Sequence, residues 1–282
     1  MENWYFLTII YAIFVGLFQC TQKKAAEKSS IYEVLAGFSL IAFVLTAFTS
    51  KDVFQIEFIS FALILLKSLV IIISWLLAMY ALSKMPISLY SVISLSKIIF
   101  SVILSIIFLG EKLTSKIIIG MIIVIIGLIL VNQNSNKKES KETSLKVFVL
   151  LLISCLLSSI SSIIDKKVLE SVTSSQLQFW FLALLTIGYW LIILIRNEKI
   201  NFKKMKNNYW ILITAICLAL GDRILFIVNK IPESQVSLII IIKQLSVIEN
   251  IIIGKLLFKE KNIIKKLLYS ILIIFGVIVV LI

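Results

Sequence analysis

The sequence contains no histidine, only two prolines and nine glycines, and few charged residues for its length. The missing histidine excludes Ser-His triads, His-ligated metals and haem, and histidine proton relays. The three cysteines, Cys20, Cys155 and Cys217, lie in separate apolar segments, without metal-ligand spacing or a disulfide framework. Because the carboxylates are also scattered, we expect no metal, no cofactor and no enzymatic activity.

Apolar residues dominate the composition. They make up 60% of the 282 residues, and charged residues make up 15%, against about 25% in ordinary soluble proteins. One soluble core could not hide so many apolar side chains, so the composition predicts a polytopic membrane protein. The formal charge of +13 would suggest nucleic-acid binding in a soluble protein, whereas here it is first an orientation signal.

A membrane-spanning helix needs about 20 apolar residues. The sequence predicts an all-α fold of ten such helices, because backbone polar groups find no water in lipid. The predicted spans are 4–21, 31–49, 58–82, 86–109, 114–132, 146–164, 175–195, 208–228, 234–257 and 263–282.

A polar, charged linker at 133–145 divides the chain into related halves, 1–132 and 146–282, with five predicted spans each. Lys84-Met85-Pro86 opens the fourth span, and Lys230-Ile231-Pro232 opens the ninth, 146 residues later. An odd number of spans forces the second copy to be inverted in the membrane. Inverted repeats around a midplane site are typical of secondary transporters.

Basic residues are unevenly distributed over the predicted loops. The side that carries the linker holds 17 of the 28 lysines and arginines, and the side that carries the termini holds six. The positive-inside rule therefore places the linker in the cytoplasm and both termini outside.

Two lysines lie deep inside predicted spans. Lys97 and Lys243 each follow the span's proline by 11 residues, about 16 Å along a helix and close to the midplane. Ionisable groups at that depth usually face a protein interior or water. We interpret the pair as two walls of a central cavity that bind a carboxylate or phosphate; a structural ion pair is the alternative.

Other polar residues accompany these lysines. Hydrogen bonds to a substrate are predicted from residues on or beside the same helical faces: Tyr90, Ser94, Ser101, Gln244 and Asn250.

Four charged residues in other positions are harder to interpret from sequence. Arg223 is either a further anion clamp or is neutralised locally by Asp222. Glu249 could pair with a neighbouring helix or, like Asp222, take part in ion coupling. Asp165, at the end of the sixth span, is expected to be a solvated cap residue.

The segment from Trp75 to Pro86 (Trp-Leu-Leu-Ala-Met-Tyr-Ala-Leu-Ser-Lys-Met-Pro) resembles the passage from the third to the fourth span in EamA-type members of the drug/metabolite transporter (DMT) superfamily. Phe108-Leu109-Gly110-Glu111-Lys112-Leu113 is similar to that family's signature after the fourth span. Phe258-Lys259-Glu260-Lys261 is similar to its second copy, with lysine in place of glycine. The resemblance implies a basket of helices around a central cavity that works by alternating access.

Within that superfamily, the plastid sugar-phosphate translocators resemble this chain in one further respect. They hold an anionic group with basic residues in the fourth and ninth spans, where Lys97 and Lys243 lie here. Gln244 stands where those transporters tend to add a second basic residue, so an organic anion or an amino-acid-like substrate fits better than a phosphate ester.

The sequence therefore predicts a multi-pass secondary transporter for a small polar metabolite in the cytoplasmic membrane of a bacterium, as monomer or homodimer. Its expected partners are the substrate, the bilayer and a coupling ion, either a proton or a counter-substrate. The alternatives are an exporter of cationic or hydrophobic drugs, and a membrane scaffold or sensor without transport. The prediction excludes nucleic acid as a partner.

Overall fold

The computed structural model describes residues 3–48, 52–85, 90, 93–94, 96–133, 145–258 and 263–281, and in this part of the chain the regular secondary structure is helical throughout. The elements are α1 (Asn3–Lys28), α2 (Ile31–Ala47), α3 (Phe58–Lys84), α5 (Ser96–Leu109), α6 (Ser115–Gln133), α8 (Leu145–Val168), α9 (Ser174–Arg196), α10 (Phe202–Asn207), α11 (Tyr209–Lys230), α12 (Val236–Ile242), the 3-10 turn η1 (Lys243–Leu245), α13 (Ser246–Phe258) and α14 (Ile263–Leu281).

The helices support a multi-pass membrane protein. Among the described residues, six helices are long and apolar enough to cross a membrane, and four shorter helices are also apolar. Large apolar side chains point away from the protein, as at Phe58 (84% exposed) and Leu194 (68% exposed). Such outward apolar faces suit a lipid environment, since a soluble protein rarely exposes large apolar patches.

The helix bounds differ from the predicted spans in a few places. The ninth predicted span is interrupted by η1, and the short helix α10 lies in a predicted loop. Most of 86–95 and of the 133–145 linker lies outside the described residues. Helix α8 continues to Val168 beyond the predicted end at 164, which changes the environment of Asp165.

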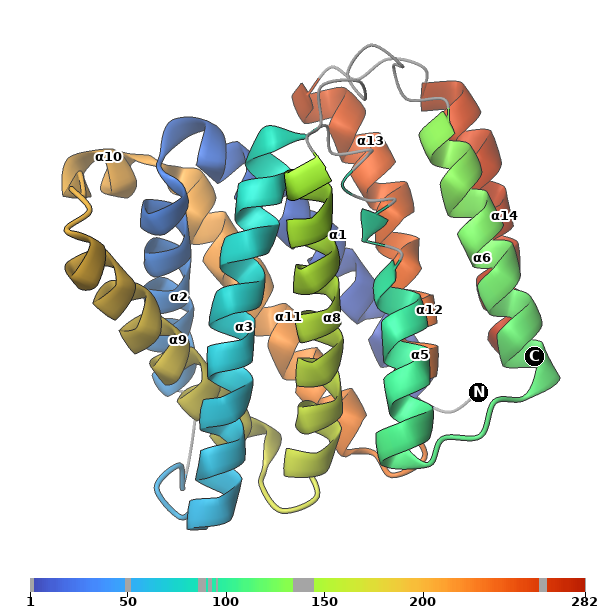
Figure 1. The fold of residues 1–282 in the computed structure, drawn as a ribbon, viewed down its shortest axis with the longest axis horizontal. Coiled ribbons are helices and arrows are strands. Elements are labelled where there is room, and N and C mark those ends of the chain that lie inside the picture. The colour runs from blue at the N-terminus through green and yellow to red at the C-terminus, as the bar shows by residue number, and fades with distance from the viewer. Residues whose placement is uncertain are drawn as a thin grey trace.

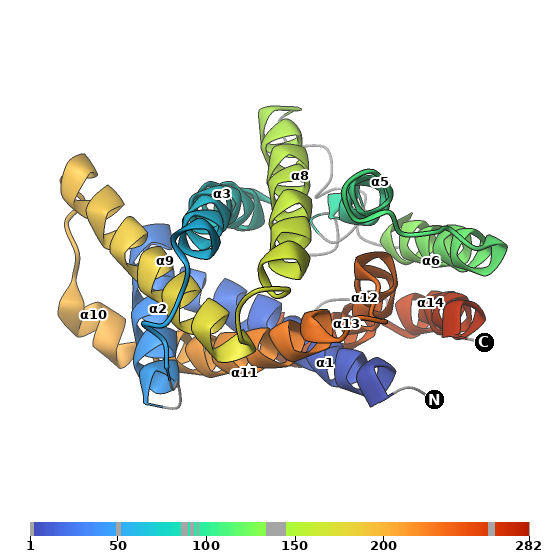
Figure 2. The ribbon, with the colours of Figure 1, turned by 90° about the horizontal axis from the view of Figure 1, so that it is seen from below.

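The helices stand roughly side by side in two rows (Figures 1 and 2). In Figure 2, α3, α8, α5 and α6 lie along one side, and α2, α11, α1, α12 and α14 along the other. The most extensive packing joins α1 to α11, α3 to α8 and α6 to α14. Each of these pairs combines one helix from each half of the sequence, so the two halves fold into one body.

Two large apolar clusters and a smaller one, which includes Leu151 and Cys155, form the interior of the described part of the chain. One large cluster is built around α2, α3, α9 and α11 and includes Phe38, Leu182 and Phe226. The other large cluster is built around α1, α5, α6, α12, α13 and α14 and includes Ile241 and Ile273. Burying such side chains stabilises by roughly 1.5–3 kcal/mol each in water; between helices in lipid, close packing carries more of the stabilisation.

Helix α6 approaches α14 unusually closely. A Cβ atom on Gly276 would lie 2.8 Å from the Gly120 carbonyl oxygen, and one on Gly120 would lie 2.6 Å from the Gly276 carbonyl oxygen. Small residues at a contact between membrane helices permit such backbone approach. Through this contact α6, the last helix of the first half, packs against α14, the last helix of the second half.

Capping boxes start the second helix of each half. Ser30 and Glu33 cap α2, and Thr173 and Gln176 cap α9, 143 residues later. Each box satisfies backbone N–H groups that the first turn of a helix leaves unpaired. The turns between α1 and α2 and between α8 and α9 are thus built alike.

Candidate functional site

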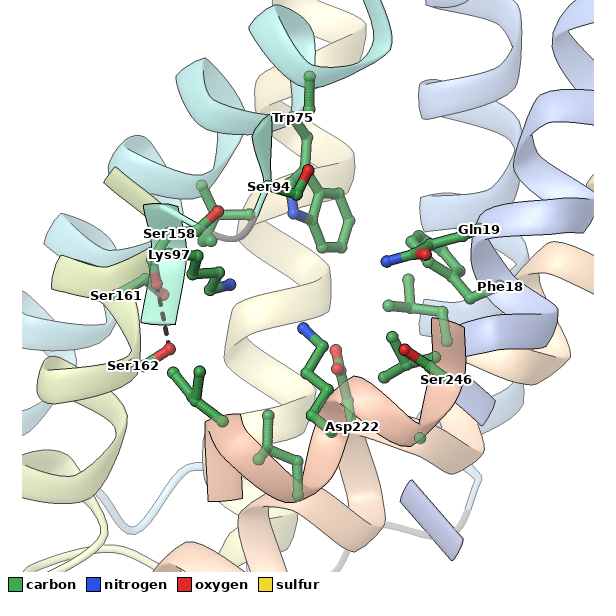
Figure 3. Close-up of a pocket in the computed structure, with 18 of the residues that line it drawn as sticks. Phe18, Gln19, Trp75, Ser94, Lys97, Ser158, Ser161, Ser162, Asp222 and Ser246 are labelled. Carbon is green, nitrogen blue, oxygen red and sulfur yellow. Dashed lines mark hydrogen bonds between the residues drawn. The ribbon is translucent and has the colours of Figure 1, made fainter. Parts of the chain in front are cut away.

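A cavity of about 210 Å³ lies among the helices, with walls from all three apolar clusters. Its lining comes from α1, α3, α5, α8, α9, α11, α12, η1 and α13 (Figure 3). Five charged residues line it, namely Lys67, Lys97, Asp165, Asp222 and Lys243. A polar interior of this kind is typical of a binding site rather than of a packed core.

Lys97 and Lys243 both lie where regular α-helix is interrupted. Lys97 is the second residue of α5, and its N–H donates to the Ser94 carbonyl at 3.1 Å, a bond of the 3-10 type. Lys243 begins the 3-10 turn η1. Irregular backbone at membrane depth is tolerated where it lines a cavity. Both lysines line the same cavity, as the sequence predicts for their position.

Four further predicted residues line the same cavity: Tyr90, Ser94, Gln244 and Asp222. The Gln244 side chain donates to the Ile240 carbonyl at 2.9 Å, which leaves its amide oxygen for a ligand. The Ser94 hydroxyl donates to the Tyr90 carbonyl at 2.8 Å, and its oxygen can still accept.

The other four predicted residues do not belong to the cavity lining. The Ser101 hydroxyl donates to the Ser159 hydroxyl at 2.9 Å. The Asn250 amide donates to Gln19 Oε1 at 2.7 Å, and Arg223 donates to the Ser175 hydroxyl at 2.5 Å.

Glu249 faces α1 instead. A Cβ atom on Gly16 would clash with the Glu249 carboxylate, so the two helices meet where this side chain lies. Its atom Oε2 is buried and accepts no hydrogen bond from the described residues.

The expectation of a solvated Asp165 was wrong. Its side chain is only 5% exposed and forms an ion pair with Lys67 of α3, whose side chain is 3% exposed. The Lys67 ammonium also lies over two aromatic rings, 3.8 Å from the Phe181 centroid and 4.6 Å from the Phe226 centroid. The physical reason is that α8 packs along α3 as far as this level, which removes water from Asp165.

Helix α8 supplies a polar wall that was not predicted as part of the site. Ser154, Ser158, Ser161 and Ser162 line the cavity, and the Ser74 hydroxyl of α3 lies 2.8 Å from that of Ser158. The signal was present, because serines and Asp165 recur along α8 at helical spacing. Serines also let helices pack closely, so the pattern alone did not separate lining from packing.

An aromatic wall closes another part of the cavity. Phe18 of α1 and Trp75 of α3 line it, with ring centroids 5.7 Å apart (Figure 3). In Figure 3 the two side chains are seen on different sides of the cavity, Trp75 above and Phe18 to the right, with Asp222 below them. Aromatic rings also lie beside the charged groups of the cavity, since the Lys67 ammonium is 3.8 Å from the Phe181 ring centroid.

Glu111 follows the end of α5 and caps the N-terminus of α12. Its carboxylate accepts from the N–H groups of Val236 and Ser237 at 2.5 and 3.1 Å, and from the Ser237 hydroxyl at 2.5 Å. A carboxylate at a helix N-terminus is favourable because it pairs N–H groups and the positive end of the helix dipole. Glu111 thereby joins the end of α5 to the start of α12.

The fold and cavity define the class as a multi-pass, all-helical membrane protein with a charged internal site. Residues 2–133 match the EamA-like transporter family, which confirms the resemblance to EamA-type members of the DMT superfamily that the motifs indicate. The match supports a membrane transporter of the DMT type.

A solved structure has the same fold. A crystal structure described as "Crystal structure of protein" is similar with a TM-score of 0.72 and 10% sequence identity, covering 96% of this chain and 95% of that one. At this identity the similarity concerns the fold alone. No functionally curated protein shows significant sequence similarity to the chain.

Proposed function

We propose that the protein is a secondary transporter for a small polar metabolite that carries a carboxylate or a similar anionic group, either an organic anion or an amino-acid-like compound. One observation carries the proposal: Lys97 and Lys243, from matching positions in the two halves of the sequence, line one internal cavity. Two ammonium groups there favour an anion and repel a cationic drug. A scaffold or sensor would hold both lysines in packed contacts with no cavity between them.

The helix packing supports two inverted five-helix repeats. If the halves are repeats, exchanging each helix with its counterpart in the other half should turn packed pairs into packed pairs. The counterparts are α1 and α8, α2 and α9, α3 and α11, α5 and α12–α13, and α6 and α14. The pairs α1–α11, α2–α11 and α5–α8 then become α8–α3, α9–α3 and α13–α1, which are also packed; α2–α9 and α6–α14 map onto themselves. Such exchange symmetry is expected of inverted repeats around a central site.

Hydrogen bonds between the halves follow the same exchange. Glu33, in the cap of α2, accepts from the Asn201 N–H in the α9–α11 connection at 2.9 Å. Gln176, at the matching position in the cap of α9, donates to the Asp52 and Gln55 carbonyls in the α2–α3 connection at 3.0 and 2.7 Å. Each capping box thus binds the connection that precedes the third span of the other half.

One pair of matched residues breaks the symmetry. The Lys230 ammonium, at the end of α11, donates to the Leu169 and Val172 carbonyls at 3.2 and 2.6 Å. These bonds fasten the α8–α9 turn, that is, they hold it against the end of α11. Its counterpart Lys84 ends α3 at the opposite side of the molecule, is exposed, and makes no hydrogen bond or ion pair to the described residues. We infer that alternating access exchanges these states, so that Lys84 fastens the α1–α2 turn when Lys230 releases the α8–α9 turn.

Removing either lysine should shift this equilibrium in opposite directions. Cys155 and Cys217 line the cavity and report its accessibility to a membrane-impermeant thiol reagent applied to one side of oriented vesicles. Lys230→Met should raise their labelling from the termini side about threefold to tenfold, because it removes charge-assisted hydrogen bonds from one state only. Lys84→Met should lower it.

Lys112→Met is the matched control, since Lys112 is an exposed lysine on the same side as Lys230. Equal labelling rates in all three variants would contradict the exchange of lysine contacts but not the substrate site.

A ligand screen tests the transport proposal itself. Purified protein is heated with anionic, zwitterionic and cationic metabolites, and compounds that raise its melting temperature are then tested for flux in proteoliposomes. We expect the stabilising and transported compounds to carry a carboxylate, because ligand binding to the folded state alone raises stability. Hits made only of cations would reverse the substrate class, and binding without flux would contradict transport.

We propose the cytoplasmic membrane as its location, with the linker inside. The start of α1 and the end of α14 lie at the end of the molecule opposite the end of α6 and the start of α8 (Figure 1), and the 17 basic residues of the linker side support a cytoplasmic position for the linker. An ion or counter-substrate would supply the driving force.

A further inference from the structure

Of the connections between helices that the structure describes, the one between α9 and α11, residues 197–208, carries the largest positive charge. It contains one acidic residue, Glu198, and four exposed lysines, namely Lys199, Lys203, Lys204 and Lys206. Among the described residues none of these lysines forms an ion pair, and Glu198 pairs with Arg196 instead, at 3.7 Å. The connection therefore presents four positive charges that the described part of the protein does not pair.

This connection is folded against the neighbouring helices rather than extended into water. The buried Asn208 side chain donates to the Ala25 carbonyl at 2.9 Å and to the Ser29 hydroxyl at 3.0 Å, which ties the start of α11 to the end of α1. Met205 of α10 packs against α2, where a Cβ atom on Gly37 would lie 3.3 Å from its sulfur. These contacts hold the lysines of α10 in fixed positions relative to α1, α2 and α11.

Aromatic and apolar side chains adjoin the lysines. Phe202, the first residue of α10, stacks on Trp190 of α9, with ring centroids 6.0 Å apart and planes inclined by 11°. Ile187 and Leu194, one turn before and one turn after Trp190 on the same face of α9, are 54% and 68% exposed. Aromatic rings concentrate where membrane helices meet the lipid headgroups. The lysines of α10 therefore lie where headgroups meet acyl chains.

The matching connection of the first half, residues 48–57, has no such charge. It carries one basic residue, Lys51, and two acidic residues, Asp52 and Glu57, so the repeat fold itself does not need the lysines. The positive-inside rule accounts for lysines in the loop, but it requires only their presence in the chain. It does not explain why a folded helix holds them beside aromatic rings and exposed apolar side chains.

We propose that α10 and the adjoining end of α9 form a binding site for an anionic phospholipid, such as phosphatidylglycerol, in the leaflet on the linker side. Lys203 and Lys206, one turn apart on α10, bind its phosphate, and an acyl chain lies along Ile187 and Trp190 of α9. Both helices lie at the outer edge of the molecule, where lipid reaches them (Figure 2). The assignment does not depend on what the central cavity binds.

Fluorescence quenching at Trp190 tests the site. The full chain is reconstituted into phosphatidylcholine vesicles that contain increasing fractions of phosphatidylglycerol with brominated acyl chains, because bromine quenches tryptophan at contact. The Trp190 signal is the difference between the chain and its Trp190→Phe variant, which keeps an aromatic ring beside Phe202. Half-maximal quenching should need at least about fivefold less brominated phosphatidylglycerol than brominated phosphatidylcholine.

Lys203→Gln/Lys206→Gln should abolish this preference for phosphatidylglycerol. Quenching by brominated phosphatidylcholine should stay at the wild-type level, which shows that the variant is folded in the membrane. Lys255→Gln/Lys265→Gln is the matched control, because it removes two exposed lysines near the α13–α14 connection, on the same side of the membrane by the predicted topology. It should keep the full preference.

Three outcomes would overturn the site. Equal quenching by the two brominated lipids in the wild-type chain would show no lipid selectivity. An equal loss of preference in both double variants would mean that the basic side as a whole attracts the lipid, and not α10. Displacement of the lipid by soluble glycerol 3-phosphate, which has no acyl chains, would assign the lysines to a soluble phosphate. None of these measurements involves flux, so a failure of the transport proposal leaves them unaffected.

Discussion

Lys67→Met should strongly destabilise the protein while leaving its membrane insertion intact. The substitution leaves the Asp165 carboxylate buried beside α3 without its cation. Breaking a buried ion pair from one side typically costs about 3–5 kcal/mol, because the remaining charge is not compensated. We expect a lower melting temperature and less monodisperse protein after detergent extraction, and the same from Asp165→Leu.

The double variant Lys67→Met/Asp165→Leu should recover much of this loss. Well-packed apolar residues of similar size often replace a buried ion pair without net cost. Lys24→Met is the matched control, because Lys24 and Glu27 form a more exposed ion pair at 2.8 Å, with side chains 19% and 46% exposed. Its effect should stay within about 1 kcal/mol. Equal melting temperatures for Lys67→Met, Lys24→Met and the wild type would refute a structural role for the Lys67–Asp165 pair.

The Lys67–Asp165 pair illustrates what the sequence could not reveal. The apolar runs predict where each helix lies, because the period and length of such runs report burial in lipid directly. An ion pair between α3 and α8 depends on which helices pack together and on their rotation, and neither is a local property. Asp165 was therefore misplaced, although the helix that carries it was predicted except for its last turn.

Asn250 shows how a small local deviation changes a predicted face. It shares a helical face with Lys243 only if the ninth span is one continuous α-helix. The three residues of η1 advance at about 120° each instead of about 100°, which rotates all later residues by roughly 60°. Asn250 consequently meets Gln19 of α1 rather than the cavity.

The positions of Lys97 and Lys243 inside the apolar helices could be read from the sequence because their signal is compositional. A lysine in the middle of an apolar run is conspicuous, and a second one at the matching position of a repeat is more so. Both line the described cavity.

Lys97→Met and Lys243→Met should each abolish transport with little loss of stability. Truncating a charge that pairs with a buried ligand charge costs about 2 kcal/mol or more, or about 30-fold in affinity. Unlike Lys67, neither lysine forms an ion pair with the described residues, so its removal breaks no ion pair of the protein. The melting temperature of the free protein should therefore stay the same or rise, while its increase on adding substrate disappears.

Lys255→Met provides the control within the same span as Lys243, since Lys255 is exposed near the end of α13 and does not line the cavity. It should transport at the wild-type rate in the same proteoliposomes. Normal flux through both Lys97→Met and Lys243→Met would show that the anion binds elsewhere. Loss of flux accompanied by a stability loss as large as that of Lys67→Met would instead assign the two lysines to the fold, because a lysine that only binds substrate contributes nothing to the folded state when the cavity is empty.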